Sequence, residues 1–110
     1  MLERRKEPRA RMSVRVTLSG HDARCEVFSE MVLATSLSRS GALLNQVLAD
    51  LRCGDLVMVE HDGQSSRFRI VWMLSSRGSP GAQVAIHKLD NQVCPWESLL
   101  PVESEVSFTN

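Results

Sequence analysis

The residues of this chain that are best suited to binding an anion are the arginines near its N-terminus. Residues 1–15 carry six cations and two carboxylates (six minus two, or +4), whereas the whole chain has a net charge of 0. Arg5 and Arg9 lie four positions apart and Arg4 precedes them, while Pro8 favours an extended or bent backbone over a helix. Guanidinium groups grip phosphate with paired hydrogen bonds. The arm therefore indicates one local anion site, and the alternative is a solvated terminus.

A second candidate is the segment at residues 36–41, Ser-Leu-Ser-Arg-Ser-Gly, which interrupts the apolar pattern between two predicted strands. The hydroxyls of Ser36 and Ser38 can donate and accept hydrogen bonds, and Gly41 permits a close approach of the backbone. Such a loop can bind a purine edge or a phosphate. The alternative is a plain connection between strands with serine-rich turns.

Patterns typical of catalytic or metal sites are missing from the sequence. The histidines and cysteines lie far apart, at His21, His61, His87, Cys25, Cys53 and Cys94. No C-x-x-C pair, H-E-x-x-H helix, nucleophile elbow or glycine-rich phosphate loop occurs. We therefore expect no catalytic residue, no bound metal, no cofactor and no disulfide, and we interpret the cysteines as free thiols.

Short apolar segments at regular spacing predict six strands. They lie at about residues 12–19, 24–35, 42–44, 56–59, 66–74 and 84–89. The dipeptide Asp62-Gly63 between two of them predicts a tight hairpin. Residues 46–54 fit either one helical turn or a loop held by apolar side chains. The segment 66–74 alternates Phe68, Ile70, Trp72 and Leu74 with Arg67, Arg69, Val71 and Met73. We place Trp72 in the core, and the alternative is a lid over the barrel.

A sheet of six short strands must close or cover its edges, so we predict an all-β fold, a small six-stranded antiparallel barrel of the Greek-key, split type. The organisation is a basic arm at 1–10, the barrel at 11–90 and a C-terminal tail at 91–110. Residues 96–100 predict a short helix that plugs the barrel and ends at Pro101, with Trp96 in the core.

Length and composition point to one small soluble domain. The chain has 110 residues, 43% of them hydrophobic, and lacks an apolar run of the roughly 20 residues that a membrane span needs. Its charged N-terminus does not resemble a secretion signal, so we expect a cytoplasmic protein without membrane contact. A nucleic-acid binder that uses the basic arm is one alternative, but aromatic residues make up only 5% of the chain, too few for stacking platforms.

The order and spacing of the two motifs resemble the PilZ domain family, receptors for the bacterial second messenger cyclic di-GMP. The family motifs are R-x-x-x-R, often after another arginine, and [D/N]-x-S-x-x-G. Arg5 and Arg9 match the first with Arg4 before them, and Ser38 and Gly41 match the second. The segments 42–44 and 67–72 also look like the family. The resemblance covers residues 3 to about 90.

The resemblance implies that Arg5 and Arg9 neutralise the phosphates and stack on guanine, with Arg4 assisting. Ser36, Ser38 and Gly41 would line the opposite wall. The arm would become ordered when the ligand binds, and this change would be passed to an unidentified protein partner. The implied ligand is cyclic di-GMP, and no nucleic-acid polymer is expected.

Ser36 departs from the family pattern, which has Asp or Asn at this position. A carboxylate can accept two hydrogen bonds from a guanine edge, whereas a serine hydroxyl reaches less far. Losing such a bond costs about 1.5–3 kcal/mol, or roughly ten- to a hundredfold in affinity. The resemblance therefore leaves a second reading, a ligand-free adaptor that binds a partner protein.

Overall fold

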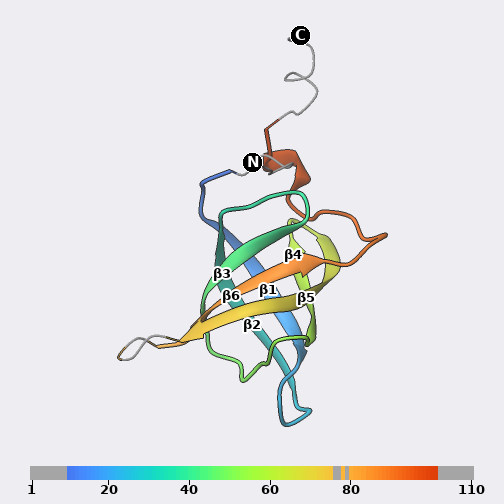
Figure 1. Cartoon of the computed structure of the whole chain (residues 1–110). Helices are drawn as coiled ribbons and strands as arrows, with labels where there is room; N and C mark the ends of the chain where they lie inside the picture. The colour runs from blue at the N-terminus through green and yellow to red at the C-terminus, as the bar shows by residue number, and fades with distance from the viewer. Residues whose placement is uncertain (1–9, 76–77, 79, 102–110) are drawn as a thin grey trace, which may run out of the picture.

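Six antiparallel strands close into one barrel in the computed structural model, which describes residues 10–75, 78 and 80–101 (Figure 1). The strands are β1 (Val14–His21), β2 (Val27–Thr35), β3 (Gly41–Val47), β4 (Leu56–His61), β5 (Gln64–Ser75) and β6 (Ala82–Lys88). Their order around the barrel is β1-β2-β3-β6-β5-β4, and β1 pairs with β4 to close it. The predicted six-stranded antiparallel barrel is confirmed.

The core of the barrel is built from alternate residues of the strands. In β1, Val16 and Leu18 are buried while Arg15 is exposed, as a period of two requires. Every strand contributes to this core, which contains Val16, Leu18, Val32, Ala34, Ala42, Leu44, Val47, Val57, Val59, Phe68, Ile70, Val84 and Ile86. Because closure pairs each strand on both sides, the barrel has no free edge.

Two connections follow from local sequence. Asp62 and Gly63 both have positive φ values, 54° and 82°, which is the conformation of a two-residue hairpin turn, and they join β4 to β5 as predicted. The ambiguous segment after β3 is a loop. Glu30 accepts hydrogen bonds from the backbone N–H groups of Leu48 and Ala49, 3.2 and 2.9 Å away, so this carboxylate holds the start of the loop in place.

Strand β5 contains an irregularity that reverses its inside and outside positions. Ile70 pairs with Ile86 and Trp72 pairs with Ala85, so Val71 is an extra residue in the ladder. Such a bulge shifts the alternation by one position. Trp72 is therefore 44% exposed on the outer surface. The prediction that Trp72 lies in the core is wrong, because it assumed unbroken alternation.

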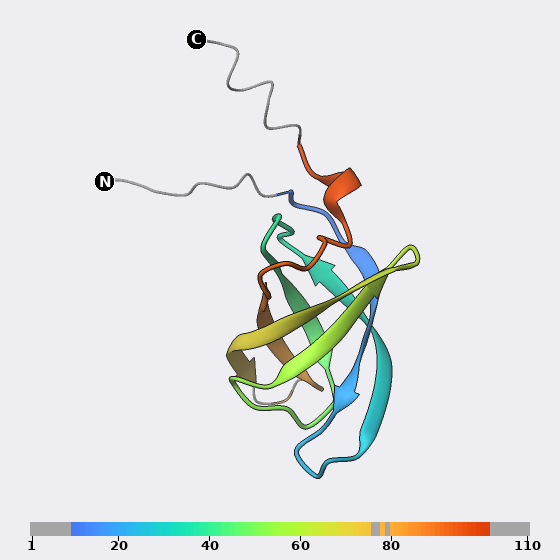
Figure 2. The ribbon, with the colours of Figure 1, turned by 90° about the vertical axis from the view of Figure 1, so that its right-hand side faces the viewer.

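The C-terminal segment covers one end of the barrel. Trp96 is fully buried and its ring stacks on Phe68 with 5.4 Å between the ring centroids. The predicted short helix is a single 3₁₀ turn at Glu97–Leu99, and Leu99 and Leu100 pack partly against the core. Figure 2 shows this turn at the same end of the barrel as the first described residues of the chain. Among the described residues, no helix is long and apolar enough to cross a membrane.

The different burial of the two tryptophans predicts that their removal destabilises the barrel to different extents. Trp96→Ala is expected to lower the free energy of unfolding by about 3–5 kcal/mol, because it leaves a cavity under the C-terminal turn. Trp72→Ala is expected to cost roughly 1 kcal/mol or less, since much of its ring is already in water. Chemical denaturation of both variants measures the difference. Equal destabilisation would contradict the assignment of Trp96 as the closing residue.

Candidate functional site

The loop at residues 36–40 joins β2 to β3 at the end of the barrel that the C-terminal segment covers. Ser36 has a φ of 52°, in the left-handed region, where Asp and Asn are tolerated better than most residues. Leu37 is fully buried and anchors the loop in the core. The loop therefore has a defined shape, set by one turning residue and one apolar anchor.

The first described residue of the chain is hydrogen-bonded to this loop. The N–H of Ala10 donates to the carbonyl of Leu37 at 2.9 Å, and the N–H of Leu37 donates to the carbonyl of Ala10 at 3.1 Å. The three predicted anion-binding arginines, Arg4, Arg5 and Arg9, lie outside the described residues. Ala10 follows Arg9 directly in the sequence and pairs with Leu37, inside the serine-glycine motif at residues 36–41. The chain therefore leads from these arginines straight to the loop.

Ser38 is buried and its polar groups are used within the fold. Its N–H donates to the carbonyl of Gly41 at 2.9 Å, and the N–H of Gly41 donates to the Ser38 hydroxyl at 3.2 Å. The Ser38 carbonyl accepts a hydrogen bond of 2.7 Å from the indole N–H of Trp96, and the Cys94 thiol lies 3.9 Å from the same oxygen. Ser38 thus links the loop to the C-terminal closure.

Gly41 is required by the close approach of two strands. A Cβ atom at this position would lie 2.3 Å from the backbone carbonyl oxygen of Ile86 on β6. That separation is far shorter than a van der Waals contact, and the neighbouring atom is backbone that cannot move aside cheaply. The glycine of the motif is therefore explained by the β3–β6 pairing, independently of any ligand.

One ion pair links the loop to the C-terminal 3₁₀ turn. Arg39 forms an ion pair with Glu97 at 3.8 Å, and both side chains are about half exposed, with 50% and 56% of their surface in solvent. Exposed pairs of this kind contribute at most about 1 kcal/mol. Nearby, burial raises the pKa of the Cys94 thiol, so this sulfur remains protonated and unreactive at neutral pH.

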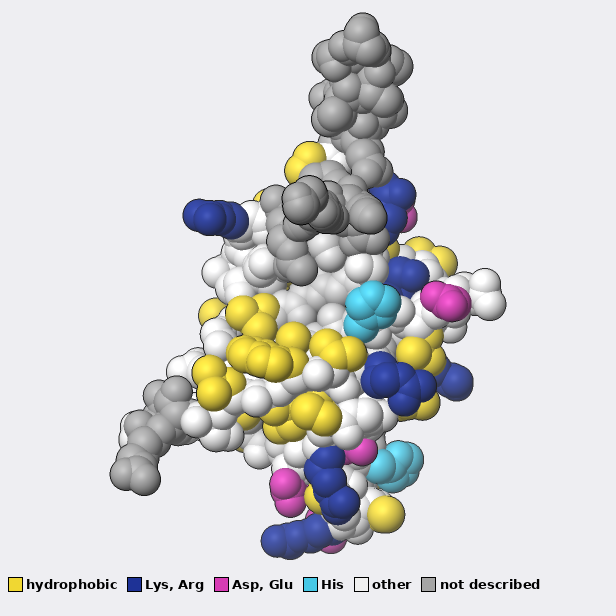
Figure 3. Space-filling view, in the orientation of Figure 1, with side chains coloured by type: hydrophobic (Ala, Val, Ile, Leu, Met, Phe, Trp, Pro, Cys, Tyr) yellow, Lys and Arg dark blue, Asp and Glu magenta, His cyan; other side chains and the backbone are white. Residues whose placement is uncertain are grey.

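Two rows of paired residues run across β3, β6 and β5 beside the loop. The first row is Gly41, His87 and Arg69, and the second is Leu43, Ala85 and Trp72. In Figure 3 hydrophobic side chains gather over β5 and β6, with cationic and histidine side chains next to them. This face therefore places positive charge beside an exposed aromatic ring.

Ser36, Ser38 and Gly41 lie in or next to one loop, where Ser38 and Gly41 hydrogen-bond to each other and shape its backbone. Sequence reasoning missed the outer row that contains His87 and Arg69. The alternation of Arg67 and Arg69 with buried residues does signal that both face outward. Nothing local shows which neighbouring strand pairs with them, so the partner His87 could not be found from sequence.

Comparison of the chain with protein-family models, with curated proteins and with solved structures gives no match in any of the three. By its fold, the chain is an all-β protein with a closed six-stranded antiparallel barrel.

The hydrogen bonds of Ser38 predict a structural penalty for its removal. Ser38→Ala is expected to lower the free energy of unfolding by about 1–3 kcal/mol, because the buried N–H of Gly41 loses its hydroxyl acceptor. Ser29→Ala, at an exposed position of β2, serves as the control and should change stability by about 0.5 kcal/mol or less. Thermal or urea unfolding of both variants tests this. A Ser38→Ala protein as stable as the control would show that the hydroxyl has no structural role.

Proposed function

We propose that the chain is a non-enzymatic receptor for cyclic di-GMP that uses its N-terminal arginines and the loop at residues 36–41. The observation that carries the proposal is the pairing of Ala10 with Leu37. It fixes the point at which the arm joins the barrel, immediately beside the loop. A ligand with two phosphates needs several cations near one surface, and Arg4, Arg5 and Arg9 precede that junction.

The outer surface next to the loop supports the other half of the proposal. Cyclic di-GMP carries two flat guanines, and the exposed ring of Trp72 offers a stacking surface two strands and one row away from Gly41. Such stacking contributes about 1–3 kcal/mol per base. The proposed site therefore runs from the arm, over the rim of the loop, onto the outer face of β6 and β5.

In this proposal the two motif residues Ser38 and Gly41 act chiefly by holding the loop in shape. Their hydrogen bonds to one another and the close approach of Ile86 account for both residue types. Ser36 and the backbone of the rim are then the parts of the loop that can meet the ligand. The signal would pass to a partner protein through ordering of the arm.

A second candidate function is that of a ligand-free adaptor that binds a partner protein. Two observations favour it: Ser36 has a hydroxyl where the PilZ motif has a carboxyl or amide, and the bulge leaves Val71 and Trp72 exposed on β5, with 53% and 44% of their surface in solvent. Exposed apolar side chains of this size mark interaction surfaces in many proteins. A calorimetric titration with cyclic di-GMP separates the two candidates, because only the receptor releases or absorbs heat.

Removal of the arm arginines should weaken binding strongly. Arg5→Ala and Arg9→Ala are each expected to lower the affinity for cyclic di-GMP by about ten- to a hundredfold, because each variant loses the charge-assisted hydrogen bonds of one arginine to the ligand. Arg24→Ala is the matched control, since it removes the same charge in the β1–β2 turn at the opposite end of the barrel. Isothermal titration calorimetry measures all three. Equal affinities in the wild type and both arm variants would overturn the proposed function.

Restoring the carboxylate at residue 36 should strengthen binding. Ser36→Asp is expected to raise the affinity for cyclic di-GMP by up to about ten- to a hundredfold, because the carboxylate can accept hydrogen bonds from a guanine edge. The left-handed backbone at this position accepts Asp readily, so the fold should be preserved. The same titration tests the change. An unaltered or weaker affinity would mean that this side chain does not face the base.

A further inference from the structure

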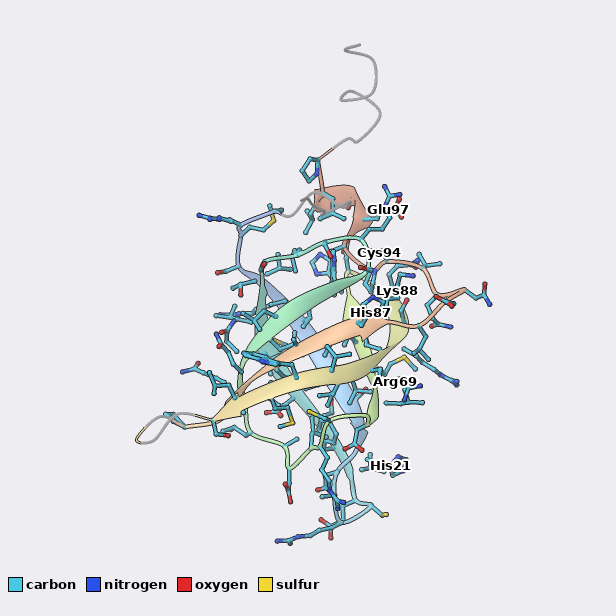
Figure 4. The ribbon with its side chains drawn as sticks, viewed as in Figure 1. His21, Arg69, His87, Lys88, Cys94 and Glu97 are labelled. Carbon is cyan, nitrogen blue, oxygen red and sulfur yellow. The ribbon has the colours of Figure 1, made fainter. Side chains whose placement is uncertain are left out.

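The outer row that begins at Gly41 continues through two side chains that can form hydrogen bonds. Gly41 on β3 pairs with His87 on β6, and His87 pairs with Arg69 on β5. Figure 4 shows His87 and Arg69 on the same side of the barrel. Neighbouring strands lie about 4.8 Å apart, so the row extends roughly 10 Å from the loop. That span is comparable to the size of a dinucleotide.

Arg69 keeps most of its hydrogen-bonding capacity. One guanidinium nitrogen, Nη1, donates to the carbonyl of Gly54 at 3.1 Å. Within the described part of the chain, Arg69 takes part in no ion pair. A guanidinium has five N–H donors, and the Gly54 contact uses only one nitrogen of Arg69. The same contact partly sets the direction of the side chain, and the other donors remain available to a ligand. Such a group can donate a bidentate pair of hydrogen bonds to two acceptors on one planar ring.

His87 offers the complementary function. Its Nδ1 lies 3.1 Å from the carbonyl oxygen of Lys88, a contact that requires a hydrogen on this nitrogen. In the neutral ring Nε2 is then the acceptor. His87 is exposed, so this acceptor is open to a ligand on the outer face. The row therefore pairs an exposed histidine on β6 with an exposed arginine on β5, whose guanidinium turns toward Gly54 on the β4 side of the strand.

We propose that Arg69 and His87 read one guanine of the bound ligand and thereby replace the contact that Ser36 cannot make. The inference rests on the proposed function. Guanine has acceptors at O6 and N7 and donors at N1–H and the N2 amino group. Arg69 would donate to O6 and N7, while Nε2 of His87 would accept from the donor edge. Both are specificity-determining residues, because adenine has a donor where guanine has O6.

The test compares binding of cyclic di-GMP and cyclic di-AMP by the wild-type chain and its variants. Arg69→Gln and His87→Ala are each expected to lower the affinity for cyclic di-GMP about tenfold and to reduce its preference over cyclic di-AMP. Arg69→Lys keeps the positive charge but cannot donate a bidentate pair of hydrogen bonds, so it should also lose the preference for cyclic di-GMP over cyclic di-AMP. Arg67→Gln is the matched control on the same strand and outer face, in the next row, and should change affinity less than about twofold.

The possible results separate this inference from the proposed function. If Arg9→Ala weakens binding while Arg69→Gln and His87→Ala bind like the wild type, the receptor function stands and the inference is overturned. Equal losses in Arg67→Gln and Arg69→Gln would show a diffuse charge effect and would also overturn it. If the wild type does not bind cyclic di-GMP, both fail. Restoration of affinity in His87→Gln, whose amide oxygen is again an acceptor, would support the assigned role.

Discussion

The hydrogen bond from the Trp96 indole to the Ser38 carbonyl is the interaction on which the closed end of this barrel depends. Both groups are buried, and a buried carbonyl without a partner would cost about 1–3 kcal/mol. The bond joins the loop after β2 to the chain segment that covers the core, and the stacking of Trp96 on Phe68 holds that segment in place. A change in the closure would therefore also disturb the loop.

Two parts of the chain hold the loop in place, so some of its residues serve mainly to fix its shape. Ala10 pairs with Leu37 on one side, while Trp96 bonds to Ser38 on the other. Ser38 and Gly41 also hydrogen-bond to each other at the loop. A serine-glycine motif of this kind can be retained for the shape of the loop alone. Its presence is therefore weaker support for ligand binding than the position at which the arm joins it.

The bulge in β5 determines the chemistry of the outer face. One extra residue turns Trp72 outward and leaves Ile70 in the core, so an aromatic ring lies in the row next to His87 and Arg69. Unbroken alternation would have buried the indole and left no flat apolar surface there. The combination of charge and aromatic surface is the feature of the barrel that suits the proposed ligand, which carries phosphates and purine rings.

The sequence alone determined the number and type of the elements. The alternation in β1 and the Asp62-Gly63 turn are local signals, because a period of two and a pair of positive φ values depend only on neighbouring residues. The tertiary structure decided the rest. The burial of Trp96, the outward position of Trp72 and the need for glycine at residue 41 all depend on backbone that is distant in sequence. Local patterns carry no information about such contacts, since pairing register and strand approach are set only when the barrel closes.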